Sequence, residues 1–274
     1  MFRAPAPVAS GFRLADVDPA STPGLDKGKA AAFIEGTSEE LSDLQERLYA
    51  ESKTGGRRSV LLILQALDTA GKGGIIRHVV GRVDPQGVQL HAFKAPTAEE
   101  AAHDFLWRIR RQLPEAGMIG VFDRSHYEDV LIHRVRRLSP AEAIEERYGL
   151  IREFEAELAA SGTTVRKVML HISRREQRER LEERLDRPDK YWKFNPGDID
   201  EREHWDEYQE AYQLAIERTA TAEAPWYVVP ADKKWYARCA VHAILLETLW
   251  ALSPQWPPAT FDVEEQRARL AASG

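Results

Sequence analysis

The feature that most constrains this chain is an apolar run that stops at a glycine-rich turn. Residues 60–64 read Val-Leu-Leu-Ile-Leu, which is typical of a short strand buried on both faces. Residues 66–74 then read Ala-Leu-Asp-Thr-Ala-Gly-Lys-Gly-Gly and lead into a stretch with helical character. A strand, a glycine-rich turn and a helix in this order predict a phosphate-binding loop (P-loop), because backbone N–H groups at a helix N-terminus can surround a phosphate.

The spacing inside the loop fits this interpretation, with two departures. Four residues separate Ala66 from Gly71 and Lys72, so that Lys72 can add its charge to the backbone donors. Ala66 replaces the usual glycine, and Gly73 stands where a serine or threonine would bind magnesium. The alternative is a structural turn with a solvated lysine. The residues expected to bind phosphate are Thr69, Ala70, Gly71, Lys72, Gly73 and Gly74.

Asp68 lies inside this loop, where an isolated carboxylate would repel phosphate. We therefore expect it to be a magnesium ligand or a base for an incoming phosphate. A second carboxylate, Asp123, follows the apolar residues 118–122, and the carboxyl ends of parallel strands share one edge of a sheet. Asp123 could then face Asp68 and hold magnesium with it, while Arg124 neutralises the transferred phosphoryl group. The alternative for Asp123 is a helix N-cap.

Strand and helix patterns alternate along the chain, which predicts a parallel α/β sheet covered on both faces. At 274 residues and 43% hydrophobic, the chain fits one domain with insertions. We expect an N-terminal extension and helix over residues 1–56, a core over 57–252 and a surface tail over 253–274. The other strands are expected at 88–93, 118–122, 165–172 and 226–229, and the helices at 39–51, 75–82, 98–112, 140–160, 174–185, 199–219 and 235–252.

Composition narrows the classes of partner and compartment. A net charge of −6 argues against an electrostatically driven nucleic-acid binder. The single cysteine forms no internal disulfide, and the eight histidines have no metal-ligand spacing. No apolar run has the length of a signal peptide or a membrane span. We therefore expect a cytoplasmic protein without nucleic-acid or membrane partners.

A basic segment follows the fourth strand pattern. Ten basic residues occur between Arg166 and Lys193, and Pro188 and Pro196 interrupt the helices there. The interruption predicts a mobile lid over about residues 174–200, whose charge would attract an anionic chain and whose closure would exclude water. Alternatively, half of these charges are paired on a solvated helix. For Trp192, packing against the core is favoured over stacking on a base.

Three motifs in this order resemble family-2 polyphosphate kinases: the loop containing Asp68, the Asp-Arg-Ser sequence that begins at Asp123, and the Trp192-Lys193 pair in the lid. The resemblance spans about residues 30–249. It implies a P-loop kinase core like that of thymidylate kinase with a helical lid, a requirement for magnesium (with manganese as the alternative), and polyphosphate in a basic channel. It also implies adenine nucleotides (with guanine nucleotides as the alternative) and a homodimer or homotetramer.

The resemblance also assigns site residues and a subgroup. Glu128 stands where many members have asparagine, which resembles the subgroup that phosphorylates both AMP and ADP. Arg184, Lys193 and Asp198 match lid positions that the family uses. The alternatives are a member acting on ADP alone, an ATP-dependent nucleoside or nucleotide kinase, and a non-catalytic nucleotide switch. The residues expected to be catalytic are Asp68, Lys72, Asp123, Arg124 and Arg184.

Overall fold

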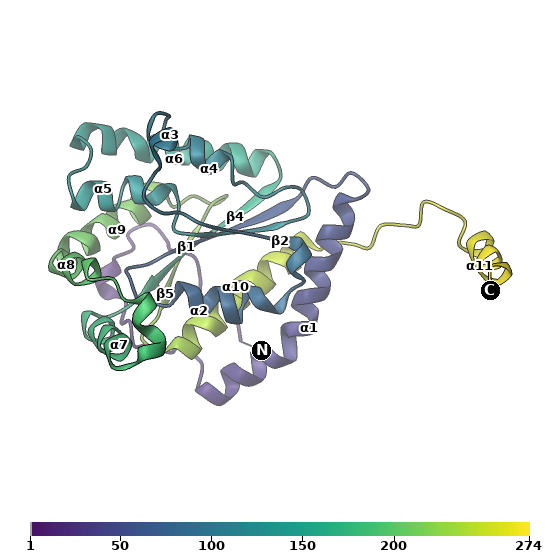
Figure 1. The fold of residues 1–274 in the computed structure, drawn as a ribbon, viewed down its shortest axis with the longest axis horizontal. Coiled ribbons are helices and arrows are strands. Elements are labelled where there is room, and N and C mark those ends of the chain that lie inside the picture. The colour runs from purple at the N-terminus through teal and green to yellow at the C-terminus, as the bar shows by residue number, and fades with distance from the viewer. Residues whose placement is uncertain (1) are drawn as a thin grey trace.

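Five strands form one parallel sheet in the computed structural model, which describes residues 2–274 (Figure 1). The strand order is β2-β3-β1-β4-β5, so that β1 lies at the centre. Every residue of β1 is buried, which explains why the strand contains almost only apolar side chains. The strands are β1 (Ser59–Gln65), β2 (Val88–Ala92), β3 (Ile119–Asp123), β4 (Thr163–His171) and β5 (Trp226–Pro230).

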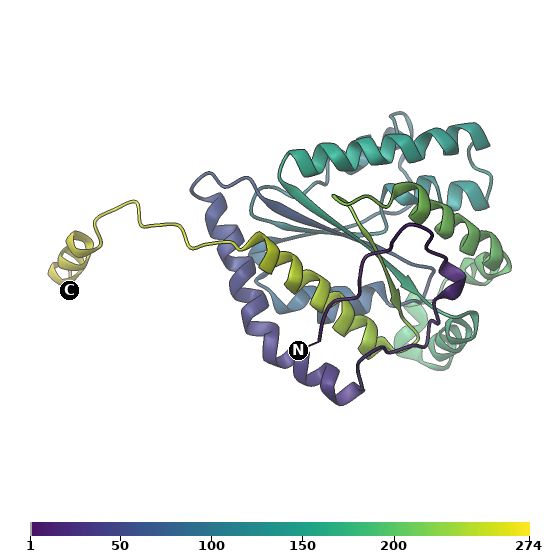
Figure 2. The same cartoon turned by 180° about the vertical axis from the view of Figure 1, so that it is seen from behind.

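Helices cover both faces of the sheet (Figures 1 and 2). The side chains of β1 alternate between two apolar clusters: Val60, Leu62 and Leu64 pack with one set of helices, and Leu61 and Ile63 with the other. The first set is α1 (Lys27–Ser52), α2 (Lys72–His78) and α10 (Lys234–Leu252), and the second is α6 (Ala141–Ala160) and α9 (Trp205–Thr219). The predicted α/β architecture is therefore confirmed.

Shorter elements connect these layers. The remaining α-helices are α3 (Ala98–Ala101), α4 (Trp107–Arg110), α5 (Ile132–Val135), α7 (Arg174–Asp186), α8 (Gly197–Glu203) and α11 (Val263–Ala272). The 3-10 helices are η1 (Leu14–Asp16), η2 (Val80–Arg82), η3 (Pro85–Gly87), η4 (His126–Asp129) and η5 (Pro188–Lys193).

Two helices expected to be continuous are broken. The stretch 98–112 contains α3 and α4 with a turn between them, because the Asp104 side chain accepts a hydrogen bond from the Leu106 N–H at 3.0 Å. The stretch 199–219 divides into α8 and α9 at His204, whose ring contacts Arg136 at 2.8 Å. Local helical periodicity did not reveal either break.

The chain ends also differ from expectation. Helix α1 begins at Lys27, twelve residues before the expected start at residue 39, because Asp26 caps it by accepting a hydrogen bond from the Lys29 N–H. The N-terminal segment lies along β5, where the Val8 N–H donates to the Trp226 carbonyl at 2.8 Å. The tail was expected to wrap the surface or to fray; it follows α1 as far as Trp256, and beyond that its last residues form α11, which stands away from the sheet and its helices (Figures 1 and 2).

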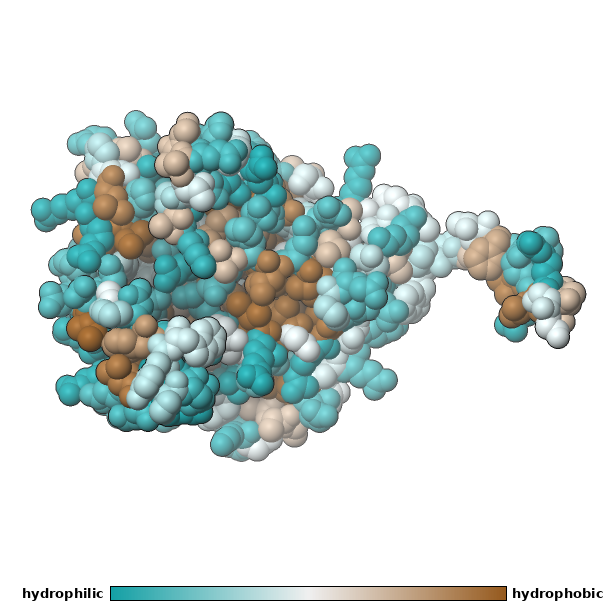
Figure 3. Space-filling view, in the orientation of Figure 1, coloured by the Kyte–Doolittle hydropathy of each residue, from teal (hydrophilic) through white to brown (hydrophobic). Residues whose placement is uncertain are grey.

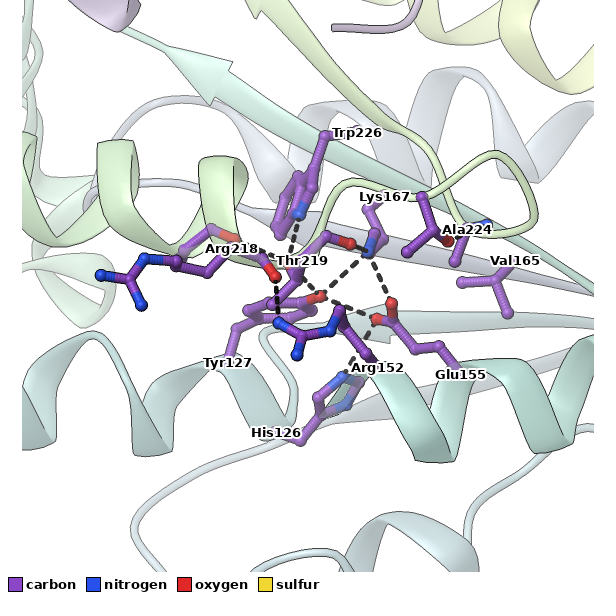
Figure 4. A network of polar contacts seen from close by, with 12 residues as sticks. His126, Tyr127, Arg152, Glu155, Val165, Lys167, Arg218, Thr219, Ala224 and Trp226 are labelled. Carbon is purple, nitrogen blue, oxygen red and sulfur yellow. Dashed lines mark hydrogen bonds and ion pairs between the residues drawn. The ribbon is translucent and has the colours of Figure 1, made fainter. Parts of the chain in front are cut away.

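A charged cluster lies inside the core between β4 and α6 (Figure 4). The Lys167 ammonium contacts the Glu155 carboxylate at 2.6 Å and also donates to the Tyr127 hydroxyl and the Thr219 carbonyl, at 3.0 and 2.8 Å. Burial would raise the pKa of Glu155, but Lys167 and His126 together outweigh this effect, so the pKa is lowered. The sequence pattern groups Lys167 with the basic residues of the lid segment, and its burial in the core corrects this.

Candidate active site at the carboxyl edge of the sheet

The P-loop connects β1 to α2 as predicted. Gly71 caps α2 with φ +119°, a left-handed conformation that glycine adopts without a steric penalty. The Lys72 ammonium hydrogen-bonds the Ala66 carbonyl at 3.3 Å and lies 3.9 Å from the Asp123 carboxylate. Lys72 therefore spans the loop toward the end of β3, and the structural-turn alternative with a solvated lysine does not describe it.

A buried guanidinium holds the loop in shape from behind. Arg180 of α7 donates to the carbonyls of Thr69 and Ala70, at 3.0 and 2.9 Å, and to those of Ala231 and Asp232, at 2.6 and 3.0 Å. These bonds tie the P-loop to the segment between β5 and α10. Sequence analysis placed Arg180 only among the lid charges, because nothing local to α7 indicates which backbone it contacts.

The two carboxylates expected to hold metal reach the same hollow. Asp123 ends β3, and the Ser125 side chain caps the next helix, so that the N-cap alternative for Asp123 is wrong. The Asp68 and Asp123 side chains are 30% and 26% exposed. Magnesium takes one or two carboxylates together with substrate phosphates, and this donor set fits that pattern. Among residues 2–274, no group of three or more metal-ligating side chains offers a cage made of protein alone.

Arg124, the residue after β3, lies between the carboxylates of Asp68 and Glu128. Its guanidinium donates to Asp68 at 2.7 Å and lies 3.9 Å from Glu128. Arg124 itself has φ +64° directly after β3, and its N–H donates to the Leu64 carbonyl at 3.0 Å. Burial would lower the pKa of Arg124, but Glu128 and Asp68 outweigh it and raise the pKa, so the side chain stays charged. Burial likewise raises the pKa of Glu128, against the opposing charges of Arg124 and Lys72.

The hollow that Asp68 and Asp123 reach is basic and has a volume of about 530 Å³. The P-loop forms its floor, and α2, α7, η5 and α10 supply its walls. Acidic groups are few there, namely Asp68, Asp123 and Glu183. Its cationic residues are Lys72, Arg77, Arg124, Arg180, Arg184, Arg187, Lys190, Lys193, Lys234 and Arg238. Such a surface suits an elongated polyanion.

A smaller hollow of about 230 Å³ adjoins the first and shares Asp68 and Arg124 with it. Glu128 and Asp198 line it together with three aromatic side chains of α9. Those aromatic residues, Trp205, Tyr208 and Tyr212, were absent from the predicted site. Their spacing on a helix is also typical of a core-facing side, so the sequence signal did not separate the two roles.

The lid residues divide between inward and outward positions. Arg184 lies 3.3 Å from Asp198 and donates to the Lys193 carbonyl at 3.0 Å. Burial and the Asp68 charge raise the pKa of Asp198 to about 6, while Arg184 opposes this. On the outer side of α7, Arg178 pairs with Glu182 in solvent, as the paired-surface alternative expects. Trp192 is 79% exposed, so the favoured packing against the core is wrong.

A parallel sheet with a P-loop, a second acidic strand end and a basic lid defines a phosphotransferase of the P-loop kinase type. The family model described as "Polyphosphate kinase 2 (PPK2)" matches residues 24–256, and the chain belongs to this family. The predicted family, fold and enzyme class are thus confirmed. Among residues 2–274, no helix is long and apolar enough to cross a membrane.

Related proteins share most of this chain. The "AMP/ADP-polyphosphate phosphotransferase" of Meiothermus ruber is 50% identical over 90% of this chain and 91% of its own. The "ADP-polyphosphate phosphotransferase" of Rhodopseudomonas palustris is 47% identical over 81% of this chain and 80% of its own. The crystal structure of polyphosphate kinase 2 from Arthrobacter aurescens TC1 is 57% identical, with a TM-score of 0.95 over 97% of this chain and 95% of that one.

Proposed function

We propose that this protein transfers phosphate from polyphosphate to AMP and to ADP, forming ADP and ATP. The observation that carries the proposal is the meeting of two unlike hollows at Asp68 and Arg124. The basic hollow takes the polyphosphate chain, and the smaller hollow with aromatic walls takes the acceptor nucleotide. The transferred phosphoryl group then lies at the junction, where Arg124 can contact both substrates.

The charges at the junction match phosphoryl transfer. Lys72, Arg124 and Arg184 stabilise the charge that spreads over the transferred group, and no covalent intermediate is needed. Asp68 and Asp123 would hold magnesium, with manganese as the alternative, and the bound ion would neutralise part of the phosphate charge. Because donor and product are both phosphoanhydrides, the reaction is nearly balanced and its direction follows the substrate ratio.

Glu128 supports AMP as well as ADP as acceptors. Glu128 lines the acceptor hollow beside Arg124. The related protein from Meiothermus ruber is named for both AMP and ADP. The adenine preference, with guanine as the alternative, rests on the family resemblance. So does an assembly of two or four copies.

The test uses purified protein, magnesium, long-chain polyphosphate and AMP without ATP, with nucleotides separated by chromatography. ADP followed by ATP is expected. ATP from added ADP, with nothing from AMP, would restrict the activity to ADP. Activity that requires ATP as donor would instead identify an ATP-dependent nucleotide kinase. Replacing AMP with GMP in the same assay measures base preference.

A further inference from the structure

The C-terminal helix α11 stands apart from the described residues that precede its tail, 2–256. None of its residues is buried, and Figures 1 and 2 show it well away from the sheet and its covering helices. In the part of the chain that the structure describes, the hydrogen bonds and ion pairs of residues 257–274 all stay within that segment. The segment also lies beyond residue 256, where the family match ends. We call residues 257–274 the arm.

An isolated helix of this length is marginal in water, because helices shorter than about 12–15 residues seldom hold their shape alone. Asp262 caps α11 by accepting a hydrogen bond from the Glu265 N–H at 3.0 Å, a local contribution on the order of 1 kcal/mol. Val263 and Leu270 lie two turns apart on one side and are 43% and 75% exposed, and Phe261 before them is 60% exposed. The arm therefore carries an apolar side that needs a covering surface.

The route of the tail leads the arm away from its own body. The Gln255 N–H donates to the Glu51 carboxylate of α1 at 2.7 Å, and the Arg47 guanidinium lies 5.8 Å from the centre of the Trp256 ring. The chain is thus attached to α1 up to Trp256. Pro257 and Pro258 follow, and consecutive prolines form a stiff extended spacer. Their stiffness opposes a return of α11 to the body from which it departs.

The charge of the arm favours a protein surface over other partners. Glu264 and Glu265 balance Arg267 and Arg269, so that α11 has no basic face for nucleic acid or an anionic membrane. The body in turn presents an uncovered apolar area beside β2 and the end of α2, drawn in brown near the middle of Figure 3. Strand β2 is an edge strand of the sheet, and its Leu90 is 52% exposed. Edge strands of this kind are ready sites for association.

We propose that α11 is an exchange arm that packs its apolar side on the β2 edge of a second copy of this chain, while the second copy's arm packs on the first. One chain then supplies both halves of the contact, and a two-fold exchange closes without leaving a free arm or a free edge. From Trp256 to Val263, an extended chain reaches about 23 Å, which is enough to cross to a neighbouring molecule.

The first measurement is the mass of the assembly by light scattering at a fixed micromolar concentration. Leu270→Glu is expected to lower the mass by about half, because a charge on the apolar side prevents docking. Ala268→Glu adds the same charge to the opposite side of α11 and should leave the mass unchanged. Circular dichroism verifies that each variant is folded. An unchanged mass for Leu270→Glu would overturn the proposal.

The second measurement locates the docking surface. Cys239 is fully buried, so a Leu270→Cys variant offers one accessible thiol for a benzophenone maleimide. Protein labelled with ¹⁵N is refolded together with unlabelled protein and irradiated, and the cross-linked peptides are identified by mass spectrometry. Mixed-isotope cross-links to the peptide containing residues 88–92 are expected. Cross-links within one isotope only, or mixed cross-links at other surfaces, would contradict the exchange.

Discussion

Two carboxylate–cation pairs in this molecule have nearly the same length and opposite surroundings. Asp68 and Arg124 meet at 2.7 Å, and Glu155 and Lys167 at 2.6 Å. The first pair is about one-third exposed at the junction of the two hollows, whereas the second is sealed in the core (Figure 4). The buried Lys167 ammonium donates to three partners, which uses all of its N–H groups. The Arg124 guanidinium donates to Asp68 and has further N–H groups that can bind a ligand. Spare hydrogen-bonding capacity, and not distance, therefore distinguishes a binding pair from a structural one.

The largest effect is expected from breaking the sealed pair on one side. Lys167→Met leaves the Glu155 carboxylate buried without its cation, which should cost about 3–5 kcal/mol of unfolding free energy. Denaturant unfolding measures this loss. A double variant that also carries Glu155→Leu should recover most of it, because no isolated charge then remains. A loss in the double variant equal to the sum of the losses in Lys167→Met and Glu155→Leu would show that the pair is not coupled.

The open pair should respond in activity instead of stability. Asp68→Asn is expected to lower kcat by about 10²–10³-fold, because it removes one of the two carboxylates that would hold magnesium and weakens the partner that positions Arg124. Its unfolding free energy should change by no more than about 0.5 kcal/mol, since the side chain is partly solvated. Asp186→Asn, at the exposed end of α7, is the matched control for loss of a carboxylate. Full turnover of Asp68→Asn at saturating magnesium would refute the role of Asp68.

Proton binding at Asp198 tests how far the charge of the open pair extends. Its pKa is about 6 in the folded protein, above its ordinary value of 3.8. Between these pH values the unfolded chain releases a proton that the folded protein retains, so this stabilising contribution is full below pH 3.8 and lost above about pH 6. Asp198→Asn should flatten the fall in unfolding free energy across this window, whereas exposed Asp200→Asn should keep it.

Asp68 is one cause of the raised pKa at Asp198. The Asp68→Asn variant should therefore move the Asp198 titration to lower pH, as followed by the chemical shift of its carboxyl carbon. An unmoved titration would mean that burial alone sets the pKa.

The smallest effect belongs to the outer side of α7. Arg178→Gln removes an exposed pair with Glu182 and should leave the unfolding free energy unchanged within the precision of denaturant unfolding. It should also leave the KM for polyphosphate unchanged. Arg184→Gln removes a cation that lines the basic hollow and should raise that KM. Equal effects of both changes on KM would show that position on α7 does not select the binding arginines.

Sequence patterns predicted the parts of the site that follow directly from strands. Asp68 follows β1 and Asp123 ends β3, and these strands are parallel neighbours, so their carboxyl ends share one edge. Other parts depend on how helices that are distant in the sequence pack. These are the bonds of Arg180 to the P-loop, the aromatic side chains of Tyr208 and Tyr212 in the smaller hollow, and the partners of Lys167. No local periodicity encodes those choices. The basic residues between Arg166 and Lys193 occupy three environments that the sequence does not distinguish: the core for Lys167, the back of the P-loop for Arg180, and the solvent-exposed surface for Arg178.

Arg180 gives α7 a mechanical property. The first half of this helix is bonded to the back of the P-loop, whereas its second half carries Arg184 toward the lid. The same rigid helix therefore contacts both the P-loop and the lid segment. If the lid moves as the sequence predicts, we expect α7 to carry the movement to the carbonyls of Thr69 and Ala70, so that substitutions in the lid also change the shape of the loop.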